Sequence, residues 1–223
     1  MHALKIDPSL EAEEAFVGYI EQEDFPCLAA KTAIARDHVT FFHGSSIDCP
    51  AHDRALLTAL IDFAQPSDAE SPFRSFAALF PSSPDKTPRE FESALWQRLQ
   101  RLHDLDVLQS PWDETVSCDP SSPDFSMSLG GHAFYVVGLH PASTRRARRF
   151  PITAMVFNLH RQFEQLREEK RYHRFSEAII ERDVAFHGSA NPMLDEHGSS
   201  SEARQYSGRV VSADWICPFK PRS

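Results

Sequence analysis

Residues 130–167 read GGHAFYVVGLHPASTRRARRFPITAMVFNLHRQFEQLR, and they carry two apolar strand patterns, three histidines and a dense arginine cluster. The first strand pattern runs up to His140, and the second, ITAMVFNLH, runs up to His160. Because side chains alternate between the two faces of a strand, His132 and His140 are expected at opposite ends of one face. If the protein has a reactive centre, the sequence predicts it in this block.

Helical patterns occur twice before this block, and a third begins at its end and continues beyond it. They cover residues 53–63, 88–102 and 161–182. At the start of the second pattern, Thr87 is the expected N-cap and Pro88 occupies the first helical position.

Two further segments complete the predicted fold. Residues 65–87 are rich in Ser and Pro and predict an extended surface connection. Apolar alternation over residues 205–216 predicts returning strands. Because the strands cluster and are joined by short connections, we expect an α+β fold, a single domain with a mainly antiparallel sheet flanked by helices.

Composition excludes several classes of protein. The formal charge of −9 and the pI of about 5.6 argue against a nucleic-acid or anionic-membrane partner, both of which need a basic face. No run approaches the roughly 18 apolar residues of a membrane-spanning helix. The acidic N-terminus does not look like a secretory signal, and the four cysteines form no CxxC pair, so we expect a cytoplasmic protein with reduced thiols.

The histidines at the two strand ends are the first candidate site. His140 directly precedes Pro141, a position that exposes an imidazole at a sheet edge. A neutral imidazole there can bind haem iron, or it can simply cap the strand by a hydrogen bond to nearby backbone. His160 can be an opposite ligand, a distal hydrogen-bond donor, or a residue that orients the start of the following helix.

The arginine cluster is the second candidate. Guanidinium groups bind carboxylates through paired hydrogen bonds, which suits haem propionates or a substrate carboxylate. Surface ion pairs with the many acidic residues are the alternative interpretation. The cluster consists of Arg145, Arg146, Arg148 and Arg149.

Three weaker patterns remain. His43, Cys49 and His52 are residue types that bind zinc, although their spacing fits no familiar structural zinc site. Cys217 precedes a proline and can bind haem iron as a thiolate or remain a buried inert thiol. The polar segment 188–209 contains carboxylates, such as Glu202, that can receive a cationic guanidino group, or it is a loop held by its own side chains.

Together, several short strings make the chain resemble the YqcI/YcgG family, in order and over nearly everything after residue 25. On this basis we divide the chain into an N-terminal extension, 1–24, and a YqcI/YcgG-like haem-binding domain, 25–223. The strings are FPC (25–27), GLHP (138–141), ARRF (147–150), FNLH (157–160), QFE (162–164), NPML (191–194), SEARQYSGR (201–209) and CPF (217–219).

The resemblance implies a cofactor and a reaction that residue spacing alone does not indicate. Members similar to this chain are haem-dependent N-hydroxylases (monooxygenases) that act on the guanidino group of free L-arginine or of a related compound in specialised metabolite biosynthesis. The cofactor is then haem b, an iron protoporphyrin, with dioxygen as co-substrate and an external electron donor. Because the sequence has no flavin or iron–sulfur motif, we expect a separate reductase.

The resemblance also suggests roles for individual residues. The family histidines map to His140, which we expect as the axial iron ligand, and to His160, the next candidate, with Cys217 third. His132 and His160 are the expected catalytic residues near the iron. For the haem carboxylates we expect Arg145, Arg148 and Arg149, and for the substrate Glu202, Arg204 and Tyr206.

Two other classes of function stay open. A non-catalytic haem sensor or carrier uses the same ligands without turnover and is distinguished by substrate-dependent oxygen consumption. A zinc-binding protein centred on His43, Cys49 and His52 is colourless and contains stoichiometric zinc. The sequence leaves a monomer and a homodimer both open.

Overall fold

The computed structural model describes residues 8–66, 73–193 and 199–222. Its centre is a five-stranded sheet in the order β1-β2-β5-β4-β3. β1 and β2 pair in parallel and all other neighbours are antiparallel, so the predicted α+β fold with a mainly antiparallel sheet is confirmed. The strands are β1 (Val39–His43), β2 (Ser75–Phe80), β3 (Met127–Leu129), β4 (His132–Leu139) and β5 (Thr153–Leu159).

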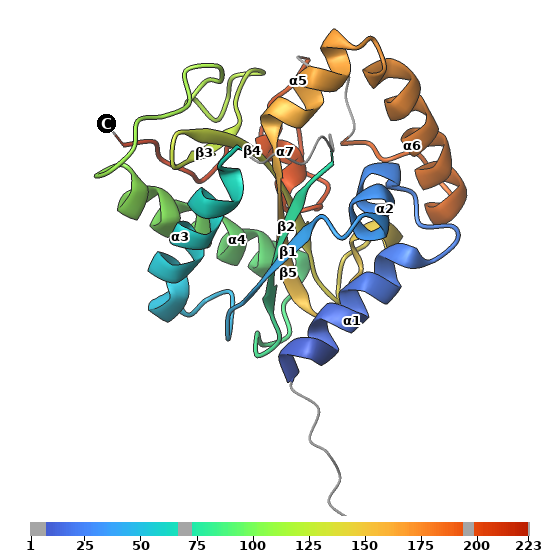
Figure 1. The fold of residues 1–223 in the computed structure, drawn as a ribbon, viewed down its shortest axis with the longest axis horizontal. Helices are drawn as coiled ribbons and strands as arrows, with labels where there is room; N and C mark the ends of the chain where they lie inside the picture. The colour runs from blue at the N-terminus through green and yellow to red at the C-terminus, as the bar shows by residue number, and fades with distance from the viewer. Residues whose placement is uncertain (1–7, 67–72, 194–198, 223) are drawn as a thin grey trace, which may run out of the picture.

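Helices cover both faces of this sheet, which Figure 1 shows nearly edge-on. On one face lie α3 (Asp53–Ala64) and α4 (Pro88–Asp106), which bury the larger apolar cluster. On the other face lie α1 (Pro8–Glu21), α2 (Leu28–Ala35) and α6 (Tyr172–His187). The segment 1–24 therefore includes a helix whose Phe16 and Ile20 are buried in the second apolar cluster. None of the helices in the described ranges is long and apolar enough to cross a membrane.

The second and third helical patterns have different outcomes. α4 begins where expected, with Thr87 and Glu90 forming a reciprocal capping box and Pro88 in the first turn. The single helix expected over 161–182 is wrong, because the chain forms α5 (His160–Glu168) and α6 with a break between them. At the break Lys170 adopts φ of 56°, a left-handed conformation that ends α5 and redirects the chain.

Two predicted segments differ from the structure. Residues 65–87 are not a surface connection throughout, because they contain β2, whose six residues are all buried between two neighbouring strands. The returning strands over 205–216 are wrong as well. That part of the chain holds the end of a short helix, α7 (Ala203–Tyr206), followed by irregular chain that packs Trp215 and Phe219 against Trp96 of α4.

Alternation along β4 decides which residues reach each side of the sheet. Phe134 and Val136 belong to the cluster under α3 and α4. Gly138 lies on the same side, where a Cβ atom would come within 2.7 Å of Leu95 and Phe91 of α4. The intervening residues, Tyr135, Val137 and Leu139, therefore point to the face covered by α1, α2 and α6.

Candidate functional site

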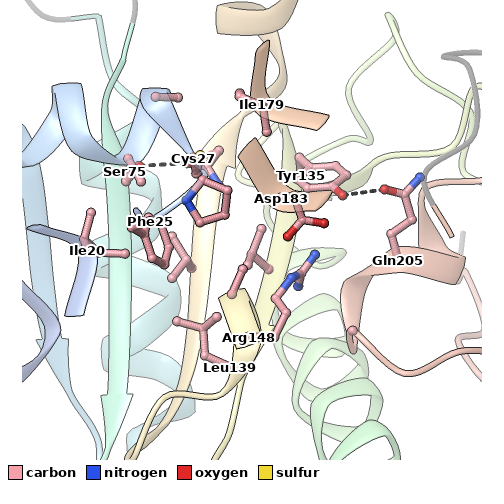
Figure 2. A pocket seen from close by; sticks show the side chains of 18 of the residues that line it. Ile20, Phe25, Cys27, Ser75, Tyr135, Leu139, Arg148, Ile179, Asp183 and Gln205 are labelled. Atoms are coloured by element: carbon pink, nitrogen blue, oxygen red, sulfur yellow. Dashed lines mark hydrogen bonds between the residues drawn. The ribbon is translucent and has the colours of Figure 1, made fainter. Parts of the chain in front are cut away.

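A cavity of about 290 Å³ lies between that second face of the sheet and the helices α1, α2 and α6. Tyr135, Val137 and Leu139 of β4 form its floor, together with Val156 and Asn158 of β5. Figure 2 shows Ile20 and Phe25 on one side of the cavity and Ile179 of α6 on another. Most lining side chains are apolar, with a few polar groups among them, as is usual for a small-molecule site.

Two pairs of polar side chains in the wall satisfy each other. The Tyr135 hydroxyl donates to Gln205 Oε1 at 2.8 Å, and the Ser75 hydroxyl donates to Asn158 Oδ1 at 2.7 Å. Burial raises the pKa of Tyr135 to about 12, so the phenol is neutral near pH 7 and can donate a hydrogen bond. These bonds hold the polar groups in place around an otherwise apolar space.

The arginine cluster separates into different roles. Arg145 is buried and forms an ion pair with Asp183 of α6. Arg146 donates to the Phe186 carbonyl and lies over its ring, and Arg149 donates to the carbonyls of residues 143 and 144. These three arginines therefore hold the loop after β4 and tie it to α6.

Arg148 is the member of the cluster that both lines the cavity and lacks a carboxylate partner in the described ranges. It lines the cavity, and its Nη1 donates to the carbonyls of Gly138 at 3.2 Å and Tyr206 at 3.4 Å. Within the described ranges, no carboxylate forms an ion pair with it. A guanidinium in an apolar wall without a counter-ion is suited to bind a ligand carboxylate.

Cys27 lines the same cavity at the N-cap of α2. Burial raises the pKa of its thiol, and the positive charge of Arg148 acts in the opposite direction without reversing the shift. The free thiol is therefore neutral near pH 7, and it must lose its proton to bind a metal ion. Met193 is the second sulfur-bearing residue in the wall.

His140 lies away from this cavity, on the other side of the sheet. Its ring stacks on Phe91 of α4, with 4.3 Å between the ring centroids, and the residue is 2% exposed. The expectation of an exposed imidazole at the sheet edge is therefore wrong, because α4 covers that side. Burial lowers the pKa of His140 to about 4, so its imidazole is neutral at pH 7.

His160 begins α5 at the end of β5, as expected, and forms part of a polar cluster beside the cavity. Its Nε2 is 2.9 Å from Glu164 Oε1, and its Nδ1 is 3.2 Å from Ser126 Oγ. The Ser126 hydroxyl donates to Glu202 Oε2 at 2.7 Å. Burial is the main reason that the pKa of Glu202 rises to about 7. The structure thus brings together two predicted site residues, His160 and Glu202, around a serine that the sequence did not indicate.

The other predicted substrate residues lie elsewhere. Tyr206 is fully buried, donates to the Phe134 carbonyl and stacks on Trp96 of α4. Arg204 donates to the Ser212 carbonyl and lines a separate surface groove. Gln205, between them in sequence, is the residue of this short helix that lines the cavity, together with the following Gly208.

The remaining candidates are also outside the cavity. His132 lies at the far end of β4 from His140, with Asp113 and Arg161 as its charged neighbours. Cys217 is buried in the cluster under α4, and burial raises its pKa to about 12. His43 Nε2 instead lies 2.6 Å from Glu13 Oε1 of α1. No metal-binding group of three or more His, Cys, Asp or Glu side chains occurs in the parts of the chain described, so the zinc hypothesis has no support there.

Sequence reasoning missed Cys27, Tyr135, Asp183 and Gln205 as residues of the cavity wall. Cys27 belongs to the FPC string, and Tyr135 lies in the strand pattern, on the face opposite to the one we examined. These two signals were present in the sequence. Nothing in the spacing indicates that Asp183 meets Arg145, because only the turn of the chain at Lys170 brings α6 over the sheet.

The comparisons with known proteins give one match. A sequence profile described as the YqcI/YcgG family matches residues 16–220. Curated proteins yield no match, and neither do solved structures. The matched range begins within α1, at Phe16, and it includes every residue of the cavity wall.

Proposed function

The chain belongs to the YqcI/YcgG family, and from this premise we propose that it is a haem-dependent N-hydroxylase of a guanidino group, with free L-arginine or an arginine-derived compound as substrate. The observation that carries the proposal is the cavity itself. It combines apolar walls, a cysteine at a helix N-terminus and an arginine that forms no ion pair with a carboxylate in the described ranges. These features suit the flat apolar rings, the iron and the carboxylates of a haem.

The donor set fits haem through Cys27 rather than through a histidine. Cysteine thiolate and methionine are both side chains that bind haem iron, and Cys27 and Met193 line the cavity. His140, His160 and Cys217 do not line it. We therefore propose Cys27 as the axial ligand in place of His140. Cys27 lines the cavity at the point where its backbone begins α2.

Arg148 is proposed to bind a carboxylate, either a haem propionate or the α-carboxylate of the substrate. Its Nη1 bonds to two backbone carbonyls and a side-chain hydrogen bond to Tyr135 fix the guanidinium in the cavity wall. Arg145 is less suited to this role, since its charge is balanced by Asp183. We therefore assign ligand binding to Arg148 and structural support to Arg145.

For the guanidinium end of the substrate, we propose the Asp183 carboxylate, whose Oδ2 pairs with Arg145 and whose Oδ1 is left for the substrate. It is the one carboxylate among the described residues that line the cavity. Glu202, our expectation from the sequence, instead accepts a hydrogen bond from Ser126 behind the wall. The amide oxygens of Asn158 and Gln205 and the neutral Tyr135 hydroxyl add acceptors and a donor that can orient the substrate.

Haem, when bound, supplies the iron at which dioxygen is reduced with electrons from an external donor. The chain's own residues hold the substrate nitrogen in a fixed orientation and keep bulk water away from it. The cavity volume is at the lower end of the roughly 300–1,000 Å³ of small-molecule sites. Binding both a porphyrin and an amino acid therefore requires α6 to move outward, against the Arg145–Asp183 ion pair that ties it to the loop after β4.

The proposal is tested by turnover. The protein is loaded with haem and supplied with a chemical reductant, dioxygen and L-arginine, and products are analysed by mass spectrometry. We expect a product with one added oxygen on the guanidino group, and none from L-citrulline, which lacks the guanidinium charge. Haem binding without any hydroxylated product overturns the hydroxylase and favours a haem sensor or carrier.

A further inference from the structure

Two side-chain amides in the cavity wall present their NH₂ groups to a ligand. Gln205 Oε1 accepts a hydrogen bond from the Tyr135 hydroxyl at 2.8 Å, and Asn158 Oδ1 accepts one from the Ser75 hydroxyl at 2.7 Å. Within the residues that the structure describes, neither amide nitrogen donates a hydrogen bond. Neither nitrogen is buried without a partner, and both residues line the cavity. The two NH₂ groups are therefore open to the cavity as donors.

The hydrogen bonds around Tyr135 fix which end of the Gln205 amide is left for a ligand. A side-chain hydrogen bond from Arg148 reaches the Tyr135 hydroxyl. Because a guanidinium can only donate, the Tyr135 oxygen accepts there and its own hydrogen goes to Gln205. The amide oxygen of Gln205 consequently faces Tyr135, and its Nε2 group remains as the donor.

Arg148, Gln205 and Asn158 form a donor cluster around Tyr135. Asn158 lies opposite Tyr135 in the register of β5 and β4, and side chains at such positions are neighbours on one face of a sheet. All three residues of the donor cluster line the cavity and carry N–H groups. Donors that include a guanidinium favour an anionic oxygen acceptor over a cation. The donor cluster therefore suits a carboxylate, which both haem and an amino acid provide.

The position of the donor cluster favours the substrate carboxylate over a haem propionate. In Figure 2, Arg148 and Gln205 lie on one side of the cavity and Cys27 lies on the other. Cys27 is the proposed axial ligand, and a substrate reaches haem iron from the face opposite to that ligand. Asp183, the proposed partner of the guanidinium, lies on the same side as Arg148 and Gln205. The side of the cavity that faces Cys27 thus holds a partner for each charged end of an amino acid.

We propose that Gln205, together with Arg148, binds the α-carboxylate of the substrate and thereby selects a free amino acid over its decarboxylated amine. This inference rests on the proposed function, because it assigns a contact to the substrate of that reaction. Gln205 donates from Nε2 and Arg148 from its guanidinium, and Asn158 adds a third donor. Hydrogen bonds to a charged group are stronger than those between neutral groups, so the loss of one lowers affinity measurably. Gln205 is then a specificity-determining residue.

The test is isothermal titration calorimetry of the full chain, with and without haem, in the absence of reductant. The ligands are L-arginine and agmatine, which has the same guanidino group and no carboxylate. Gln205→Glu keeps an acceptor for the Tyr135 hydroxyl and replaces the NH₂ group with a negatively charged oxygen. Gln205→Met removes the donor without adding a charge. Gln97→Glu is the matched control, at an exposed position of α4 on the opposite face of the sheet.

We expect the wild type to bind L-arginine at least about tenfold more tightly than agmatine. Gln205→Glu is expected to reverse this preference, because its carboxylate repels that of L-arginine and attracts the ammonium group of agmatine. Gln205→Met is expected to weaken L-arginine binding by about tenfold and to leave agmatine binding unchanged. Gln97→Glu is expected to keep the wild-type ratio of the two affinities.

The outcomes separate this carboxylate contact from the proposed function. If Gln205→Glu and Gln205→Met keep the wild-type ratio, the contact is overturned, and hydroxylated product from the wild type still supports the hydroxylase. Weaker haem binding by both variants with that unchanged ratio assigns the donor cluster to a propionate and also overturns the contact. The expected ratios without any hydroxylated product support the contact and overturn the hydroxylase. A wild type that binds agmatine as tightly as L-arginine, or that binds neither, overturns the contact.

Discussion

Replacing Asp183 with Ala removes the carboxylate that faces Arg145 between α6 and the loop after β4. Arg145 and Asp183 are 5% and 7% exposed, so the guanidinium remains buried without a charge beside it. It keeps the carbonyls of Ser189 at 3.1 Å and Ala190 at 3.3 Å as acceptors. Breaking a buried ion pair costs about 3–5 kcal/mol. Because two acceptors remain, we expect a loss of about 3 kcal/mol in the free energy of unfolding.

The assay is equilibrium urea unfolding of the ligand-free protein. With a denaturant slope of about 2–3 kcal/mol/M, the midpoint falls by about 1–1.5 M urea. Glu169→Ala is the control, because Glu169 pairs with Arg171 at an exposed position and such pairs contribute under about 1 kcal/mol. The double variant Arg145→Met/Asp183→Leu is expected to recover most of the loss. If Asp183→Ala shifts the midpoint no more than Glu169→Ala, the Arg145–Asp183 ion pair does not stabilise the contact between α6 and the loop, and the reasoning is refuted.

Three further predictions concern the two faces of β4. The native protein keeps His140 neutral down to pH about 4, whereas an unfolded histidine takes up its proton near pH 6.5. The neutral imidazole therefore contributes about 3 kcal/mol to the free energy of unfolding above pH 6.5, and this contribution is lost as the pH falls to 4. In His140→Phe, urea unfolding at pH 7 and pH 5 should differ less than in the wild type, and an equal difference contradicts the burial. Gly138→Ala places a methyl group 2.7 Å from Leu95 and Phe91 and is expected to lower the unfolding free energy by about 1–3 kcal/mol, measured by urea; an unchanged midpoint indicates a looser contact with α4. Arg148→Met is expected to weaken L-arginine binding to the haem-loaded protein at least about tenfold by spectral titration, and an unchanged affinity removes Arg148 from the ligand site.

Local signals in the sequence were sufficient where a helix has complete end signals. α4 combines an N-cap, a proline in the first turn and regular apolar spacing, and all of these are found in the structure. β2 was missed because SFAALF is buried on both faces and so shows no alternation. The break between α5 and α6 was missed because the residues around Lys170 favour helix by themselves. The chain turns there because α6 packs over the sheet, a contact between distant segments.

The candidate residues from the sequence lie on one face of β4, and the cavity lies on the other. We followed His132 and His140 along β4, whereas the cavity is lined by Tyr135, Val137 and Leu139 of the same strand. Alternation shows that a strand has two faces, but it does not show which face a helix fills and which one keeps a cavity. Of the arginines, Arg145 and Arg146 find their partners on and after α6, which only folding brings near, so the sequence did not separate them from Arg148.

The central claim is that the cavity between the sheet and α6 holds haem through Cys27. The most direct measurement is the absorption spectrum of haem-titrated protein, ferric and then reduced with carbon monoxide, in the wild type, in Cys27→Ala and in His140→Phe. Our account predicts stoichiometric haem binding by the wild type and by His140→Phe with the same spectrum, and an altered or absent haem spectrum in Cys27→Ala. Failure of the wild type to bind haem contradicts the account, as does a Cys27→Ala spectrum identical to that of the wild type.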